Sequence, residues 1–331
     1  MDAHTEWQRS AGALGVLWLG ALLCLVLLLP SSAEASYTRH LKGYLLDKSA
    51  AVPELVIYGG SRSEKAEPGY MEHLTGIPGF NAAVMSSQPS DMLAFATSLH
   101  DRDPALRQFP LMFLSVEAFR RDNLFHPELL TMPDLMAEMP ADLLTGVTLL
   151  DPVSFKPPAD LAYSDGNQWR SDGSLRISRY DVALANGVSR EKLLATRVKQ
   201  YLASYDNFTR LSSGQKRVFE TTIARMNSWH WVPVVLLPPY SDGLLSVLKR
   251  HGWTARHRET VEFLADLQLR YKMVVIDFSH VDSFGGWSEG LFDGVHGSTQ
   301  LMRFMLRKVV AASNRAFDPT VPYGIPLSSR N

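Results

Sequence analysis

The stretch LVIYGGSRSEK, residues 55–65, runs a short apolar segment directly into Gly59, Gly60 and Ser61. The β-branched and aromatic residues at its start are typical of a buried strand. Two glycines allow a sharp backbone turn and leave the following serine hydroxyl uncovered. Gly-Gly-Ser is also common in ordinary turns. The stretch alone therefore leaves two interpretations open: a plain turn, or a nucleophile at the end of a sheet.

Short apolar segments of the same kind recur along the chain, and helical patterns separate most of them. Strands alternating with helices predict an α/β domain with a largely parallel sheet. In open sheets of this type, ligands bind beyond the carboxyl ends of the strands, which is where Ser61 follows its strand. We expect strands at residues 55–58, 111–114, 147–150, 232–237 and 273–276, and helices at 89–99, 189–204, 215–231, 256–271 and 298–312.

A serine needs a base to accept its proton, and the base needs a partner that orients it. The loop GLFDGVHGSTQLM, residues 290–302, carries Asp293 three positions before His296. On a single turn, this spacing can place a carboxylate against one imidazole nitrogen and leave the other nitrogen free to act as a general base. The chemistry would pair a serine after the first strand with an Asp-x-x-His loop near the end of the chain. Read separately, Asp293 fits helix capping and His296 fits a surface position.

The Gly-Gly-Ser-Arg motif at Ser61 and the Asp-Gly-Val-His motif at His296 resemble the SGNH (GDSL-like) hydrolase superfamily. The closest similarity is to its membrane-anchored members, which take part in teichoic acid D-alanylation and exopolysaccharide O-acetylation. The resemblance covers roughly residues 53–312. It implies a three-layer, flavodoxin-like fold with Ser61 as nucleophile, His296 as base and Asp293 as the orienting carboxylate.

The resemblance also implies an oxyanion hole that includes the Ser61 backbone N–H. The family's third block, Gly-x-Asn-Asp, is not recognisable, and its counterpart at residues 114–119 contains no asparagine. Loss of one such donor costs about 10²–10³ in turnover. Arg62 also fits an exposed salt bridge, and Trp287 also fits a rim aromatic packed on the domain itself. The candidates for oxyanion or substrate binding are Gly60, Asn81, Ser86, Ser87, Arg62 and Trp287.

Residues 11–29, AGALGVLWLGALLCLVLLL, form an uncharged apolar run. At about 1.5 Å per residue, a helix of this length nearly spans a hydrocarbon core of about 30 Å. The length favours a single transmembrane anchor, with the N-terminus in the cytoplasm and the following domain outside the cell membrane. Ala33 and Ala35 form an Ala-x-Ala pattern, which keeps a cleaved signal peptide and a secreted domain as the alternative.

The expected organisation has three parts. Residues 1–35 hold a cytoplasmic stub and the anchor, residues 36–317 an SGNH-like catalytic domain, and residues 318–331 a Pro-rich tail. Within the domain, residues 151–188 are rich in Pro, Asp, Gly and Ser and predict a long loop excursion from the sheet. Such an excursion fits a lid or binding loop, and a mobile linker equally.

The composition limits the partners and the chemistry. The net charge of −1 gives no sign of a nucleic-acid-binding surface, and hydrophobic residues at 46% allow a sizeable core. The single cysteine, Cys24, lies in the apolar run, so the rest of the chain has no internal disulfide and no cysteine metal site. Neither an HExxH pattern nor a nucleotide-binding glycine loop occurs, so we expect no cofactor and no metal.

These expectations together describe a membrane-anchored extracytoplasmic serine acyl hydrolase or O-acyltransferase. Its substrate would be an acylated saccharide or lipid of the cell envelope, and a multi-pass membrane acyltransferase is an expected partner. One alternative is a non-catalytic SGNH-like module that binds carbohydrate or a partner protein. A second alternative is a metal-dependent phosphoesterase that uses Asp293 and His296.

Overall fold

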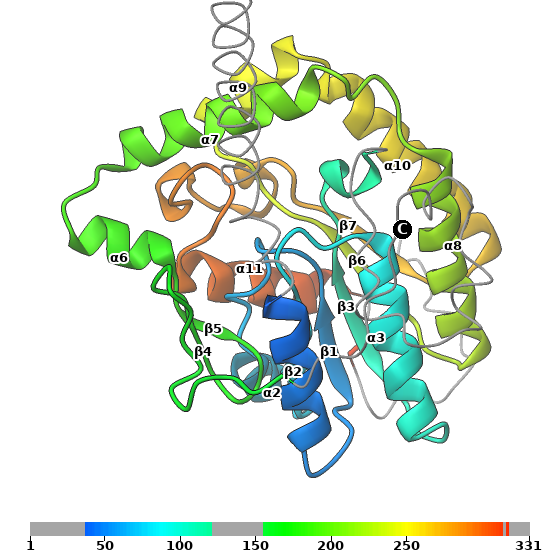
Figure 1. Cartoon of the computed structure of the whole chain (residues 1–331). Coiled ribbons are helices and arrows are strands. Elements are labelled where there is room, and N and C mark those ends of the chain that lie inside the picture. The colour runs from blue at the N-terminus through cyan, green and yellow to red at the C-terminus, as the bar shows by residue number, and fades with distance from the viewer. Residues whose placement is uncertain (1–36, 121–154, 314–315, 318–331) are drawn as a thin grey trace, which may run out of the picture.

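The computed structural model describes residues 37–120, 155–313 and 316–317 of the chain. Five parallel strands form a central sheet in the order β2-β1-β3-β6-β7, and helices surround it (Figure 1). The chain runs from β1 to β2 on one side and then crosses to β3 on the other. The strands are β1 (Leu55–Tyr58), β2 (Gly79–Asn81), β3 (Phe109–Phe113), β6 (Val234–Leu237) and β7 (Val274–Asp277).

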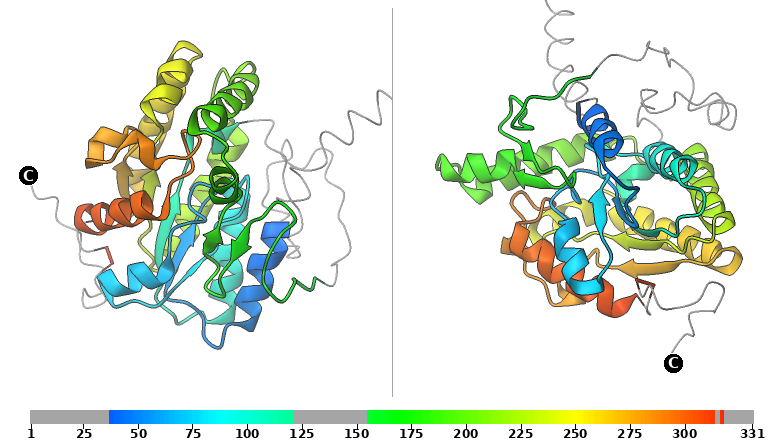
Figure 2. Two further views of the ribbon diagram at one scale, coloured as in Figure 1. Left: turned by 90° about the vertical axis from the view of Figure 1, so that its left-hand side faces the viewer. Right: turned by 90° about the horizontal axis from the view of Figure 1, so that it is seen from below.

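Helices cover both faces of the sheet. Helices α2 and α11 pack on one face, and the helical residues 37–48 pack with α3 and α8 on the other (Figure 2). The sheet is therefore the middle of three layers. The helices are α2 (Pro68–Thr75), α3 (Pro89–Arg102), α6 (Arg179–Ala185), α7 (Arg190–Tyr205), α8 (Ser213–Ser228), α9 (Asp242–Arg250), α10 (Trp253–Arg270) and α11 (Thr299–Ala312), with shorter turns η1 (Val116–Phe119), η3 (Val281–Phe284) and η4 (Ser288–Gly290).

The strands are apolar on both sides because both faces are buried. In β1, Val56 and Tyr58 contribute to the core beneath α3 and α8, whereas Leu55 and Ile57 contribute to the core beneath α2 and α11. All four side chains are at most 1% exposed. Successive side chains of a strand point to opposite faces of the sheet. Because both faces are buried here, every position of the segment is apolar.

The expected excursion at residues 151–188 contains more structure than a loop. Its described part holds a small antiparallel pair, β4 (Gln168–Trp169) and β5 (Leu175–Ile177), followed directly by α6. Helix α6 begins with a capping box, in which Ser178 accepts from the Asp181 N–H while Asp181 accepts from the Ser178 N–H. The segment stays outside the central sheet, as expected, but it forms a defined unit.

The expected α/β class and the largely parallel sheet are confirmed. Four of the five expected strands and all five expected helices are present within a few residues of their expected bounds. Strand β2 and helices α2 and α9 were not anticipated. The strand expected at 147–150, the apolar run at 11–29 and the tail at 318–331 lie outside the described residues. Within the described ranges, none of the helices has the length and apolarity needed to cross a bilayer.

Candidate active site

Ser61 opens the turn that follows β1, at the carboxyl edge of the sheet. Gly59 has a φ of +145°, and a Cβ there would lie 2.8 Å from the Cβ of Phe113 on the neighbouring strand. Only glycine fits this conformation and this close approach. Gly60 has no such constraint, because an added Cβ would meet its nearest atom, the Ser87 nitrogen, at 3.8 Å. The turn therefore requires glycine at position 59, whereas the hydrogen side chain of Gly60 leaves open space beside Ser61.

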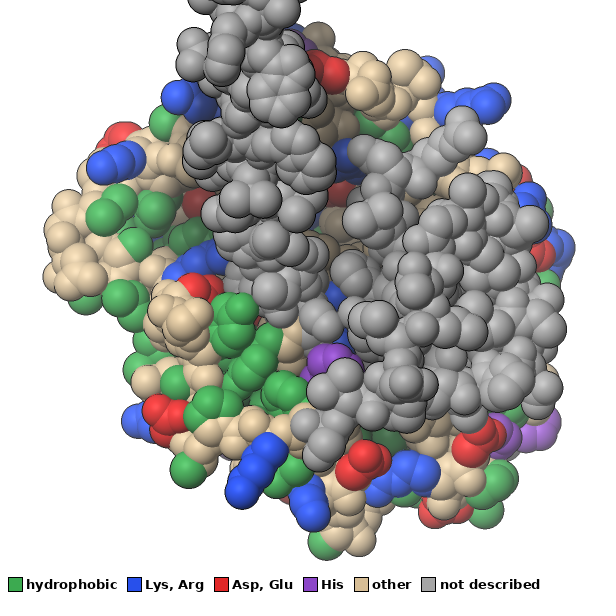
Figure 3. Space-filling model, viewed as in Figure 1, with side chains coloured by type: hydrophobic (Ala, Val, Ile, Leu, Met, Phe, Trp, Pro, Cys, Tyr) green, Lys and Arg blue, Asp and Glu red, His purple; other side chains and the backbone are tan. Residues whose placement is uncertain are grey.

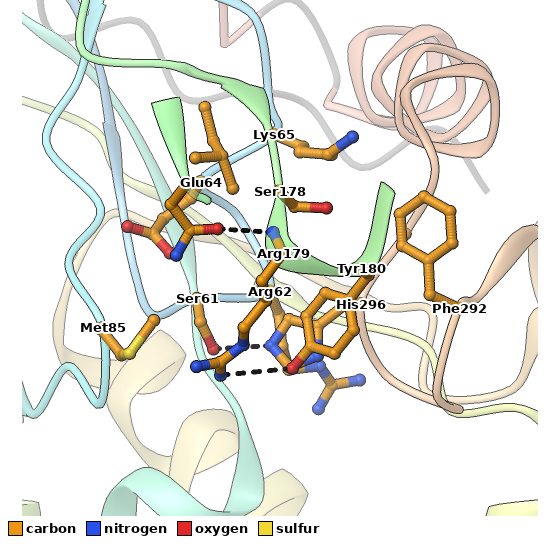
Figure 4. Close-up of a pocket in the computed structure, with 13 residues that line it drawn as sticks. Ser61, Arg62, Glu64, Lys65, Met85, Ser178, Arg179, Tyr180, Phe292 and His296 are labelled. Carbon is orange, nitrogen blue, oxygen red and sulfur yellow. Dashed lines mark hydrogen bonds between the residues drawn. The ribbon is translucent and has the colours of Figure 1, made fainter. Parts of the chain in front are cut away.

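The loop between η4 and α11 brings Asp293 and His296 to the same place. The Ser61 hydroxyl lies 2.8 Å from His296 Nε2, although 235 positions separate the two residues (Figure 4). On the other side of the ring, His296 Nδ1 lies 2.9 Å from Asp293 Oδ2. The carboxylate also accepts the backbone N–H of His296 at 3.0 Å. Since Nδ1–H faces a carboxylate, Nε2 is the nitrogen that accepts the hydrogen bond from the Ser61 hydroxyl.

The surroundings favour a neutral imidazole and an ionised carboxyl. Burial lowers the pKa of His296, and the positive charges of Arg197 and Arg179 lower it further, while Asp293 acts in the opposite direction. For Asp293, burial raises the pKa, but His296 and Arg197 outweigh it and hold the pKa well below its usual range. A neutral histidine next to an anionic aspartate is the state that a general base requires.

Ser86 and Ser87 lie in the wall of a cavity at Ser61. Both line the same cavity as Gly60, Ser61 and His296. Ser86 has a φ of +53°, a left-handed conformation that non-glycine residues adopt mainly where the surrounding structure imposes it. The turn thus holds a glycine-like backbone at Ser86. This geometry suits presentation of backbone N–H groups to an anion.

Asn81 is close in the fold but does not face the cavity. Its amide nitrogen donates to the carbonyls of Ser63, Glu64 and Ala66, and its amide oxygen accepts from the Ala83 N–H at 2.9 Å. These bonds use the side chain completely, and the residue is fully buried. The expectation that Asn81 binds an oxyanion is therefore wrong: this side chain shapes the turn after Ser61.

Arg62 is only 7% exposed and lines cavities on both sides of Ser61. Its Nη2 donates to the Pro238 carbonyl at 2.9 Å, and the guanidinium lies over the Tyr240 ring. The alternative of an exposed salt bridge is thus excluded for Arg62. Within the described part of the chain, its Nε and Nη1 have no hydrogen-bond acceptor.

Trp287 packs against Phe304 of α11, with ring centroids 5.6 Å apart, and lines neither of the cavities at Ser61. The expectation that it binds substrate is not supported by this position. Its packing role matches the alternative that the sequence left open, an aromatic residue at the rim of the domain.

Two helices that the sequence did not connect to the site complete it. Helix α6 carries Tyr180, whose ring stacks on His296 at a centroid distance of 4.6 Å, and Arg179 beside it (Figure 4). Helix α7 carries Arg197, whose Nε donates to Asp293 Oδ2 at 2.7 Å. The capping box at Ser178 marks the start of α6 in the sequence, but nothing local places it beside His296.

Two cavities meet at Ser61, and both are also lined by Arg62 and His296. The smaller lies beneath α6 and contains about 350 Å³ of space that is partly open to solvent, with Met85, Leu175 and Phe292 among its apolar walls. The larger, of about 940 Å³, is more open and is lined by residues from η1, α7 and the loop after β6.

The counterpart of the missing Asn-Asp block lies in the wall of the larger cavity. Glu117 of η1 accepts hydrogen bonds from the hydroxyls of Tyr205 at 2.7 Å and Tyr240 at 2.8 Å. Burial raises the pKa of both tyrosines, with the Glu117 charge adding to the effect, so both remain donors. The block at residues 114–119 therefore supplies a carboxylate held by tyrosines.

No protein-family model matches this chain, and a search of curated proteins found no match to it. Among residues 37–120 and 155–313, no three His, Cys, Asp or Glu side chains gather as a metal site would require.

Proposed function

We propose that this protein is an SGNH-type serine acyl hydrolase or O-acyltransferase that works through an acyl-serine intermediate. The observation that carries the proposal is the chain of contacts from Ser61 through His296 to Asp293, at 2.8 and 2.9 Å. Hydroxyl, imidazole and carboxylate in this order form the arrangement that activates a serine in acyl transfer.

In the proposed reaction, the Ser61 oxygen attacks the carbonyl carbon of an ester while its proton passes to His296 Nε2. Asp293 stabilises the imidazolium that forms. Collapse of the tetrahedral intermediate breaks the ester bond, and His296 returns the proton to the leaving alcohol. Water or a saccharide hydroxyl then gives its proton to His296 and attacks the acyl-serine. The bond between the acyl carbon and the Ser61 oxygen breaks, and His296 passes the proton to that oxygen, which restores the free Ser61 hydroxyl.

The negative charge on the tetrahedral intermediate needs donors that are already in place. The backbone N–H groups of Ser61 and of the Ser86–Ser87 turn are the proposed donors, because these residues line one cavity with Gly60. Arg62 remains a candidate for binding an anionic part of the substrate. We assign a short acyl group to the smaller cavity and the alcohol part of the substrate to the larger, more open one.

The topology supports the same proposal. The strand order corresponds to 2-1-3-4-5, as in flavodoxin-like sheets, in which ligands bind at the point where the strand order reverses. That point is the carboxyl end of β1 and β3, where Ser61 and Glu117 follow their strands. A three-layer SGNH fold has this layout, so topology and site agree.

The proposed setting is the outer side of a cell membrane, with the apolar run at 11–29 as anchor, or outside the cell if that run is cleaved. The proposed substrates are acylated saccharides or lipids of the envelope, and a multi-pass membrane acyltransferase is the proposed partner. On the face seen in Figure 3, basic and acidic side chains are interspersed, in keeping with a net charge of −1.

Covalent labelling with a fluorophosphonate tests the nucleophile. We expect one label per chain in the native protein, no label in Ser61→Ala, and labelling slowed at least about 100-fold in His296→Gln because the base is lost. Ser204→Ala is the matched control, since Ser204 lines the larger cavity but lies on α7, where its hydroxyl bonds to the Tyr201 carbonyl. Labelling that persists in Ser61→Ala would contradict the proposal.

A native protein that takes no label but binds acylated saccharides would instead support the non-catalytic alternative. The absent Asn-Asp block is the feature that favours this second possibility. A stoichiometric metal ion in the active protein would support the phosphoesterase alternative.

A further inference from the structure

Arg197 makes a set of contacts that a serine–histidine–aspartate triad does not need for its basic geometry. Its Nε and Nη2 both lie 2.7 Å from Asp293 Oδ2. The same Nη2 donates to the Tyr180 hydroxyl and lies 3.5 Å from His296 Nδ1. The Arg197 side chain is 16% exposed and that of Asp293 is 1% exposed, so solvent screens this ion pair little.

The contact with His296 is not an ordinary hydrogen bond. Both the guanidinium and the Nδ1–H group are donors, and the nitrogen lone pair of Nε2 faces Ser61. A positive charge at this distance repels a proton added to the ring and so acts in the same direction as burial of the ring, whereas Asp293 acts in the opposite direction.

Among the described residues, three elements of the site bring charged groups to the ring. Asp293 approaches from the ring's own loop, Arg197 from α7, and Arg179 with the neutral phenol of Tyr180 from α6. The further groups that line the smaller cavity with His296 are Arg62, Glu64 and Lys65. Burial of the ring is the largest cause that favours the uncharged imidazole; the two arginines add to it, and Asp293 opposes it.

We propose that Arg197 is a positioning residue of the acyl-transfer reaction: it fixes Asp293 and keeps His296 unprotonated under mildly acidic conditions. The inference rests on the proposed function for its catalytic meaning. Tyr180 contributes to the same role, because its ring covers one face of the His296 imidazole and its hydroxyl holds the Arg197 guanidinium in place. The enzyme therefore remains active at a pH at which an ordinary histidine, with a pKa of about 6.5, would be half protonated.

Titration of His296 tests the inference directly. We would follow the His296 imidazole signal by proton NMR, assigned by its loss in His296→Gln, in the native protein, Arg197→Gln and Arg197→Lys. We expect a native midpoint below about 6.5 and a rise of about one pH unit in Arg197→Gln, because a charge next to the ring is removed. Arg197→Lys keeps the charge and should keep the native midpoint, with a lower kcat because the two-point contact with Asp293 is lost.

We would also measure the pH dependence of kcat/KM on a chromogenic acetate ester. The pH at which kcat/KM falls on the acid side should shift together with the NMR midpoint of each variant, and the change should lie in kcat rather than in KM. Lys199→Gln is the matched control: it removes the same charge from the exposed side of α7 and should leave both the midpoint and the limb unchanged. Equal midpoints in native protein and Arg197→Gln would overturn the inference, and so would a raised midpoint in folded Arg197→Lys. An inactive native protein whose midpoint still shifts would refute the proposed function and leave the electrostatic role of Arg197 intact.

Discussion

At the scale of single residues, backbone conformation at Ser86 links the sequence to the proposed oxyanion hole. A left-handed conformation costs a non-glycine residue roughly 1–2 kcal/mol, and Ser86 keeps it at a φ of +53°. The neighbouring helical segment imposes this conformation: Arg39 donates to the Met85 and Ser86 carbonyls, and Thr38 accepts from the Met85 N–H. Strain held by surrounding bonds is common where a backbone must present its N–H groups.

Substitutions at Ser86 separate this backbone role from a side-chain role. Ser86→Gly should leave labelling within about twofold and raise the free energy of unfolding by up to about 1 kcal/mol, since glycine adopts this conformation without strain. Ser86→Val should lower that free energy by about 1 kcal/mol or more and slow labelling, because a β-branched residue resists positive φ. Chemical denaturation and labelling rates measure both effects. A large loss of activity in Ser86→Gly would show that the hydroxyl itself is needed.

At the scale of elements, the β4–β5 pair and α6 act as a cover for Ser61. Leu175 of β5 donates its N–H to the Glu64 carbonyl, and Asp172 accepts from the Asn81 N–H. Lys65 and Asp181 of α6 form an ion pair at 2.5 Å. This unit carries Tyr180 to the His296 ring, so we expect its docking to position the proposed base.

Gly173 is the tightest point of that docking. It has a φ of +79°, and a Cβ there would overlap the Asn81 carbonyl oxygen and lie 2.8 Å from Phe80 Cζ. Gly173→Ala should cost about 2–4 kcal/mol of stability and lower kcat/KM at least about tenfold as Tyr180 shifts.

Gly187→Ala is the control for conformation alone. Gly187 has nearly the same φ, +80°, but no atom lies within 4 Å of the Cβ position. The Gly187→Ala substitution should lower the free energy of unfolding by only about 1 kcal/mol and leave kcat/KM unchanged. Equal effects at Gly173 and Gly187 would show that docking of the pair does not control the site.

At the scale of the whole molecule, a buried ion pair joins the start of the described chain to the site. Arg39 and Asp91 are 0% and 3% exposed, and two bonds of 2.8 and 2.7 Å connect them. Arg39 thereby ties the helical residues 37–48 to α3 and to the Ser86 turn at once. Fold stability and site geometry depend on the same side chain.

Arg39→Met should destabilise the protein by about 3–5 kcal/mol, because it leaves the Asp91 carboxylate buried without its partner. Adding Asp91→Asn should recover part of this stability, since no buried charge remains, while kcat stays low because the Ser86 turn is still released. Thermal unfolding and steady-state kinetics on the same samples measure the two effects. Recovery of kcat together with stability would show that Arg39 has no separate role at the site.

The sequence by itself determined the α/β class and the residues that meet at the candidate site. Strand and helix periods are local, and Ser61 directly follows a recognisable strand. Because carboxyl ends of parallel strands share one edge, a serine after the first strand and an Asp-x-x-His loop after the last could be expected to meet there. Asp293 and His296 are three residues apart, so their contact depends on local geometry alone.

Only the tertiary structure decided what surrounds these residues. Arg197 lies 96 positions from Asp293 and Tyr180 lies on a separate helix, so no local pattern connects them to the base. Asn81 and Trp287 were expected at the site, but the structure gives them packing and hydrogen-bonding roles outside it. A polar amide or an aromatic ring near a motif fits either role, so the sequence could not separate the two. Long-range packing decides which polar groups are already bonded, and a side chain whose hydrogen bonds are all made has none left for a substrate.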